Sequence, residues 1–175
     1  FWLDSLLTEV VTDADATETA VRAVNRVASF VKAGASVVSK ELLGQNMPEP
    51  LGTGTLRNFK SRPLFATSGP SADDVRQGQV GDCWWLASIS AVADTSPEFL
   101  RQMITDLGDG TYAVRFKHPT AGVDQFVRVD ADLRTYSWST TLPSYANFGA
   151  EGSLWVPLME KALTWVRGSR IGNYT

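Results

Sequence analysis

Apolar residues recur at helical spacing along the first part of the chain. The positions that would share one helix face are Ala20, Val24, Val27, Val31 and Val38. Asp15 and Glu18 have the spacing of a capping box, which starts helices, and Gly44 stands where a helix would end. The pattern therefore predicts a helical N-terminal extension over residues 1–45.

The pattern changes after this extension. Residues 46–73 combine several glycines with four prolines, Pro48, Pro50, Pro63 and Pro70. Such a composition is typical of irregular connectors. We expect residues 46–73 to be a linker and residues 74–175 to form the main domain.

Within the main domain, helical and strand periodicities alternate. Helices are predicted from Asp82 to about Ala93, from a Ser96 cap onward, and from Gly152 or Ser153 to Gly168. Strands are predicted around residues 112–116 and 126–129, joined by a hairpin turn at residues 119–122. The first helix is apolar and contains Trp84, Trp85, Leu86, Ile89 and Val92. The expected buried side of the second consists of Phe99, Leu100, Met103 and Ile104, and the apolar face of the third consists of Leu154, Trp155, Leu158, Met159, Ala162 and Trp165. The expected fold class is α+β, mainly helical with a small antiparallel sheet.

Composition and charge exclude several classes of function. The net charge is −3 and the isoelectric point is about 5.1, which does not favour binding to nucleic acid or to an anionic membrane surface. We interpret the short basic run at Arg57, Lys60 and Arg62 as a solvated face. The sequence also lacks an apolar run of the roughly 18 residues that would predict a membrane span.

The chain has one cysteine, Cys83, and one histidine, His118. It therefore cannot form an internal disulfide or a Cys/His zinc site, and we expect no structural metal. A reducing compartment such as the cytoplasm fits a single thiol better than secretion does. The first residues lack both an initiator Met and the basic start of a signal peptide, so we expect the chain to be part of a longer protein.

The candidate chemistry surrounds Cys83. A glycine-containing turn leads directly into an apolar helix, and the cysteine lies at the helix start, in the segment Gln77-Gly78-Gln79-Val80-Gly81-Asp82-Cys83-Trp84. Helix N-termini stabilise a thiolate through their free N–H groups and partial positive charge. The Cys83 amide and the Gln77 side chain are candidate donors to an oxyanion. Gly81, Asp82 and Trp84 are candidate substrate-binding residues, and Trp84 is expected to pack under the turn.

This segment, followed by Leu86-Ala87, resembles the active-site signature of the calpain family of cysteine proteases. Two later stretches are also similar to the calpain protease core, namely Phe126-Val127-Arg128-Val129-Asp130 and Leu158-Met159-Glu160-Lys161-Ala162. The resemblance covers roughly residues 62–175. It implies the Cys-bearing half of a papain-like domain, in which Cys83 is the nucleophile of peptide-bond hydrolysis and Gln77 is an oxyanion donor.

The resemblance also implies that the catalytic His and Asn lie in a second subdomain, beyond residue 175. His118 matches no catalytic position of the family. Without a base, residues 1–175 are expected to show no peptidase activity of their own. The expected partners are this second subdomain and a polypeptide substrate.

The resemblance also raises the question of a calcium site. Calpains bind a regulatory calcium ion, and Gly69 and Asp74 match the family's loop positions by their spacing from Cys83. The family's third ligand, a Glu, is replaced at Ser153-Leu154, with Glu151 nearby. We therefore expect no required cofactor, and a regulatory calcium site that is weak or absent unless Glu151 compensates. We favour the interpretation of Asp74 as a turn cap.

Two other classes of function remain open. One is a protease-like module that binds without catalysis. The other is a different thiol-dependent acyl transferase. The reactivity of Cys83 and the choice of substrate distinguish these alternatives.

Overall fold

The computed structural model describes residues 54–117, 122 and 124–167. Three α-helices and five short strands make up this part of the chain, so the predicted α+β class is confirmed. The expected N-terminal helix and the hairpin turn with His118 lie outside the described residues, apart from Gly122.

Three strands form one antiparallel sheet in the order β2-β3-β4. Their bounds are Ile104–Asp106 for β2, Thr111–Lys117 for β3 and Asp124–Asp130 for β4. The predicted strands around residues 112–116 and 126–129 are thus confirmed, and Val114 pairs with Val127 in their register. Strand β2 was not expected, because Ile104 was assigned to the preceding helix. Ile104 is nevertheless fully buried, as part of the sheet.

A second, two-stranded sheet joins distant parts of the chain. Strand β1 (Thr55–Asn58) pairs antiparallel with β5 (Asp132–Thr135). Residues 54–73 were expected to be an irregular connector, yet they contain β1 and bury Phe59 in the core. Arg57 and Lys60 are exposed, as expected. Arg62 differs, because its guanidinium lies 4.1 Å from the centre of the Phe148 ring.

Three helices complete the fold. Helix α3 spans Cys83–Thr95, and α4 spans Pro97–Met103 with Ser96 as its N-cap residue and Pro97 in its first turn, as predicted. Helix α5 spans Trp155–Val166 and begins two or three residues later than expected. Two short 3-10 helices, η3 (Ala72–Asp74) and η4 (Ala150–Gly152), precede α3 and α5.

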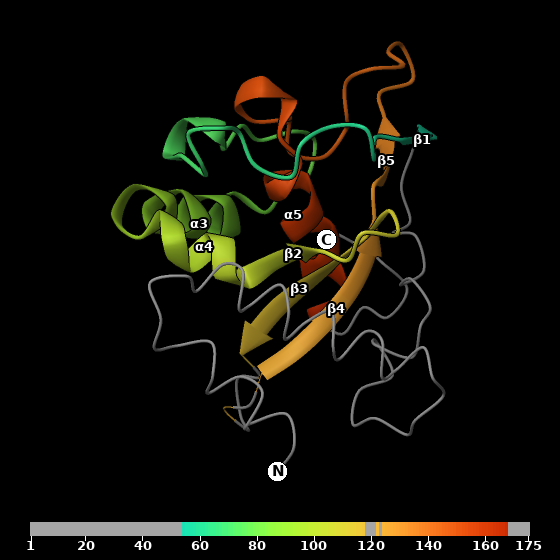
Figure 1. Cartoon of the computed structure of the whole chain (residues 1–175). Coiled ribbons are helices and arrows are strands. Elements are labelled where there is room, and N and C mark those ends of the chain that lie inside the picture. Colours follow the sequence, from blue (N-terminus) through green and yellow to red (C-terminus); the bar gives the residue numbers. More distant parts are fainter. Residues whose placement is uncertain (1–53, 118–121, 123, 168–175) are drawn as a thin grey trace.

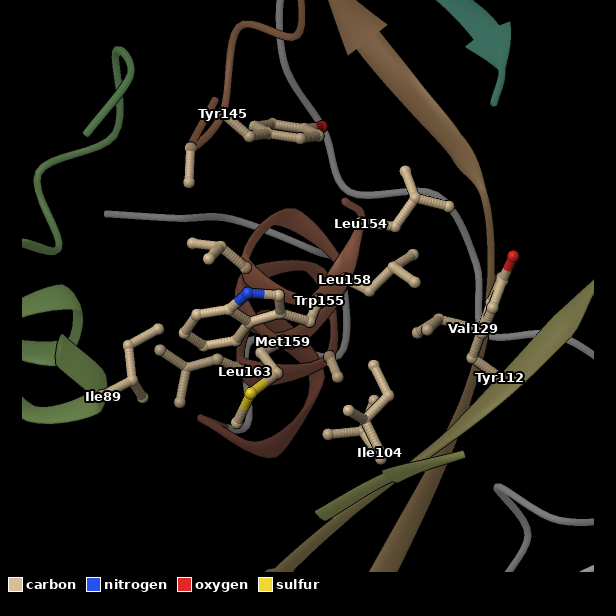
Figure 2. Packing of buried hydrophobic residues seen from close by; sticks show 14 of the residues in the cluster. Ile89, Ile104, Tyr112, Val129, Tyr145, Leu154, Trp155, Leu158, Met159 and Leu163 are labelled. Atoms are coloured by element: carbon tan, nitrogen blue, oxygen red, sulfur yellow. The ribbon is translucent and has the colours of Figure 1, made fainter. Parts of the chain in front are cut away.

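Helix α5 is the centre of the core. It lies between α3 and the three-stranded sheet (Figure 1). Trp155, Met159 and Leu163 occupy the middle of the cluster, with Ile89 of α3 on one side and Ile104 and Val129 of the sheet on the other (Figure 2). Helix α5 is therefore buried around most of its circumference, which places even Glu160 and Lys161 in the interior.

Helices α3 and α4 each bury only one side. In α3 the buried residues are Leu86, Ile89 and Ala93. Trp84 was expected to pack under the turn but is 50% exposed, and Phe99 of α4, which was expected on the buried side of its helix, is 49% exposed. The fully buried residues of both helices, including Leu100 of α4, are thus aliphatic, whereas these two aromatic rings lie at the surface. In the part of the chain that is described, no helix has the length and apolar character needed to cross a bilayer.

Candidate active site

The loop before α3 is hydrogen-bonded to a second loop, at residues 144–147. Gln79 N donates to Ser144 O at 2.9 Å, and Asn147 N donates to Arg76 O at 2.8 Å. Between these two bonds, a Cβ at Gly78 would collide with the Tyr145 carbonyl oxygen. Gly78 is therefore required by the close approach of two backbones, in addition to the turn expected from the sequence.

Cys83 is the first residue of α3, and its side chain is exposed. The carbonyl oxygen of Asp82, the N-cap residue, accepts from Trp85 N at 2.8 Å and from Leu86 N at 3.1 Å. The Cys83 amide belongs to the first turn, whose N–H groups have no acceptor within the helix. The predicted position of the thiol at an accessible helix N-terminus is confirmed. The free N–H groups of this turn are candidate donors to an oxyanion formed beside the thiol.

Gln77 is also exposed and belongs to the same loop. Its side-chain Nε2 donates to the Val80 carbonyl oxygen at 2.7 Å. A side-chain amide carries two N–H groups, so one hydrogen of Nε2 remains for a ligand. The bond to Val80 holds the amide against the turn that precedes Cys83. The role of Gln77 as an oxyanion donor stays a prediction.

The three candidate substrate-binding residues lie in different environments. A Cβ at Gly81 would meet nothing within 4 Å, so the space beside this residue is open. Trp84 lies on the outer surface with the Arg167 guanidinium 5.1 Å from its ring centre, which corrects the expectation that it packs under the turn. Trp85 takes the inner position and contacts Phe116. Asp82 is 2% exposed, so its side chain faces the interior and not a substrate.

The Asp82 side chain does not cap its own helix. Its carboxyl group instead neighbours the carboxyl group of Glu160 of α5, which is fully buried. Burial raises the pKa of Glu160 to about 9, and the nearby Asp82 charge acts in the same direction. Burial also raises the pKa of Asp82, although its hydrogen bond to Glu160 opposes this. With a pKa of about 9, Glu160 keeps its proton at neutral pH.

Sequence reasoning missed Glu160 as a site residue. Its motif was recognised, but the helical pattern was interpreted from its apolar positions alone. The available signal was the charged Glu160-Lys161 pair inside a run of apolar residues. In the fold, Lys161 Nζ donates to Asp130 Oδ1 and to Asp132 O, each at 2.7 Å, and Glu160 faces the turn before Cys83.

The loop around Asp74 is satisfied by the protein itself. Asp74 Oδ1 accepts from Ala150 N at 2.7 Å, and Asp74 Oδ2 accepts from Trp155 Nε1 at 2.8 Å and from Ser71 N at 3.1 Å. Together with Ser71, Asp74 forms the capping box of η3, so the expected turn cap is present. Glu151 accepts from both Thr67 N and Thr67 Oγ1.

A cation would meet a poor environment at this loop. The Arg101 guanidinium lies against Gly69, where it would collide with any added Cβ. Among the described residues, no group of three His, Cys, Asp or Glu side chains is placed to hold a metal ion. The side chains around Asp74 therefore do not fit the calcium site that the family resemblance implies.

Comparison with known proteins finds calpains, both as a family and as individual relatives. A family model described as calpain family cysteine protease matches residues 47–171. Calpain-A of Drosophila melanogaster is 32% identical over 112 residues, covering 61% of this chain and 13% of that protein. Human Calpain-12 is 27% identical over 152 residues, covering 80% of this chain and 20% of that protein. The Calpain-type cysteine protease ADL1 of Oryza sativa is 27% identical over 120 residues, which cover 5% of its length. The chain thus spans a small part of each relative.

Proposed function

Since this chain belongs to the calpain family of cysteine proteases, we propose that it supplies the nucleophile and the oxyanion donors of a papain-like endopeptidase. The observation that carries this proposal is the exposed Cys83 thiol at the first position of α3. The substrate is a polypeptide, and the reaction is peptide-bond hydrolysis through an acyl-thioester.

In the proposed reaction, the Cys83 thiolate attacks the carbonyl carbon of the scissile peptide bond. The carbonyl oxygen becomes an oxyanion, to which the Cys83 amide and the Gln77 side chain donate. The C–N bond then breaks, the amine leaves with a proton, and the acyl group stays on Sγ as a thioester. Water hydrolyses the thioester, which releases the acid and restores the thiol.

A general base is needed to move these protons. The only histidine of the chain is His118, which matches no catalytic position in the family resemblance. We propose that the His and Asn come from another part of the protein, which would cover the exposed side of α3 at Trp84, Ala87 and Ser88. The small share of each relative that the chain matches supports this division of the site.

Thiol reactivity and peptidase activity together test the proposal. Cys83 should react with iodoacetamide at neutral pH faster than a cysteine in an unstructured peptide, and Cys83→Ser should abolish labelling. The 175-residue chain alone should not cleave casein, because it lacks the base, and a longer chain that contains the predicted His and Asn should do so. Cleavage by the short chain that Cys83→Ser abolishes would contradict the division of the site.

The same experiments separate the alternative functions. A Cys83 that labels no faster than a peptide cysteine would favour a non-catalytic binding module. Incorporation of an amine into casein, without cleavage, would favour an acyl transferase. Both outcomes are readable because the chain has a single thiol.

We also propose that the chain acts without calcium. The support is the occupation of Asp74 by three N–H donors and the Arg101 guanidinium beside Gly69. Titration calorimetry should detect no heat of calcium binding, and millimolar calcium should leave the unfolding temperature unchanged. A saturable calcium isotherm that Asp74→Asn removes would refute this proposal.

A further inference from the structure

Two buried carboxyl groups, those of Asp82 and Glu160, are neighbours beneath the turn that carries Cys83. Asp82, immediately before Cys83, directs its side chain inward, and Glu160 reaches the same point from the middle of α5. Both residues are almost completely buried, at 2% and 0% exposure. A buried carboxylate needs donors to compensate for lost hydration, so the partners of these oxygens matter.

The donors available to the pair are few. Glu160 Oε2 accepts from Ala146 N at 2.7 Å. Asp82 Oδ1, Asp82 Oδ2 and Glu160 Oε1 receive no hydrogen bond from the N–H and O–H groups of the described residues. A carboxyl group that keeps its proton is a donor, whereas two carboxylates can only accept. A proton held between the two groups therefore satisfies one oxygen of each carboxyl group, which would otherwise be buried without a hydrogen-bond partner.

Few charged groups reach the pair. The Arg167 guanidinium, at the end of α5, interacts with the Asp82 charge and also lies over Trp84. Lys161 adjoins Glu160 in the sequence but is bound to Asp130 and Asp132. The Cys83 thiol follows Asp82 directly in the chain. Among the described residues, Arg167 is therefore the cation whose charge acts on Asp82.

We propose that Asp82 and Glu160 share one proton, and that this hydrogen bond positions the N-terminus of α3 and with it the Cys83 nucleophile. Glu160 connects three segments, because it also holds Ala146 in the loop that binds Arg76 and Gln79. Loss of the proton, which passes to solvent, leaves two carboxylates facing each other and separates the α3 turn from α5. Asp82 and Glu160 act through Cys83 and are positioning residues.

This inference rests on the proposed function only for the role of Cys83, so its test does not use peptidase activity. The first measurement follows the Ala146 backbone amide, which donates to Glu160 Oε2, by NMR of the 175-residue chain from pH 6 to 10. We expect a titration step near pH 9 that reports the loss of the shared proton. The step should disappear in Glu160→Gln, which keeps a donor and an acceptor but cannot ionise.

The second measurement is the rate of Cys83 alkylation by iodoacetamide at pH 7. Glu160→Gln should keep the rate within about twofold of the unchanged chain, because its amide still donates to Asp82. Glu160→Ala should lower the rate roughly fivefold, the size of a lost helix-terminus effect on a thiolate. Glu98→Gln, the same substitution at a side chain that is 71% exposed, is the matched control and should change neither readout.

Two results would overturn the inference. One is an Ala146 amide without a step near pH 9 in the unchanged chain, a result that needs no variant to fold. The other is an alkylation rate in Glu160→Gln as low as in Glu160→Ala, with both proteins folded by circular dichroism. If Cys83 instead alkylates no faster than a peptide thiol, the proposed function fails, and the amide titration still decides the shared proton.

Discussion

Gly78 and Gly81 flank the same turn but meet different surroundings. At Gly78 an added methyl would collide with the Tyr145 carbonyl oxygen, whereas at Gly81 it would meet open space. We therefore expect Gly78→Ala to lower the free energy of unfolding by roughly 1–3 kcal/mol, since the two loops must separate. Gly81→Ala is the control and should stay within about 0.5 kcal/mol. Urea unfolding measures both, and equal values would contradict the close approach.

Glu160 predicts how stability depends on pH. Its pKa is about 9 in the folded chain, against 4.5 in the unfolded chain, so the folded state holds a proton that the unfolded state has released. The stabilisation is complete below about pH 4.5 and is lost as the pH rises toward 9. Between these values the free energy of unfolding should fall by roughly 1 kcal/mol for each pH unit.

Urea unfolding from pH 5 to 9 checks this slope, with Glu160→Gln as the comparison. The variant cannot release the proton, so its stability should be nearly independent of pH over the same range. A slope that is identical in both proteins would assign the pH dependence to other groups.

At the scale of elements, Asp74 joins three of them. It belongs to η3 and accepts from Ala150 of η4 and Trp155 of α5. Asp74→Ala would leave Ala150 N and the buried Trp155 Nε1 without this acceptor. We expect the substitution to lower the free energy of unfolding by roughly 3 kcal/mol. Asp73→Ala, at an exposed neighbour in the same 3-10 helix, is the control and should cost less than about 0.5 kcal/mol. Thermal unfolding compares the two, and similar losses would indicate that the Asp74 bonds contribute little.

Elements with a local signal could be predicted from the sequence. Helix α3 follows a glycine turn, α4 begins at Ser96-Pro97, and β3 and β4 alternate in hydrophobicity. Strand β1 has no such signal, because all four of its residues are exposed and only its pairing with β5 defines it. Strand β2 is three residues long and directly follows α4, so its local sequence continues the helical pattern.

The residues of the candidate site also fall into those with a local sequence signal and those without one. Cys83 and Gln77 could be found because their motif is contiguous, and Cys83 lies where the motif places it. Glu160 could not be assigned, since it lies 78 residues beyond Asp82 and meets it only through the packing of α5. The position of Trp84 was wrong because apolar character alone does not tell which side of a helix a ring occupies.

At the scale of the whole molecule, the pairing of β1 with β5 has a consequence for any shortened form of the protein. Thr135 Oγ1 donates to Thr55 O across 80 positions of the chain, so the two ends of a long loop close on each other. Starting the protein at residue 74, where the sequence alone places the main domain, would remove one strand of this sheet. The backbone of Asp132–Thr135 would then be an open edge, a ready template for association between copies. Aggregation of such a truncated form would reflect this exposed strand and not a damaged catalytic turn.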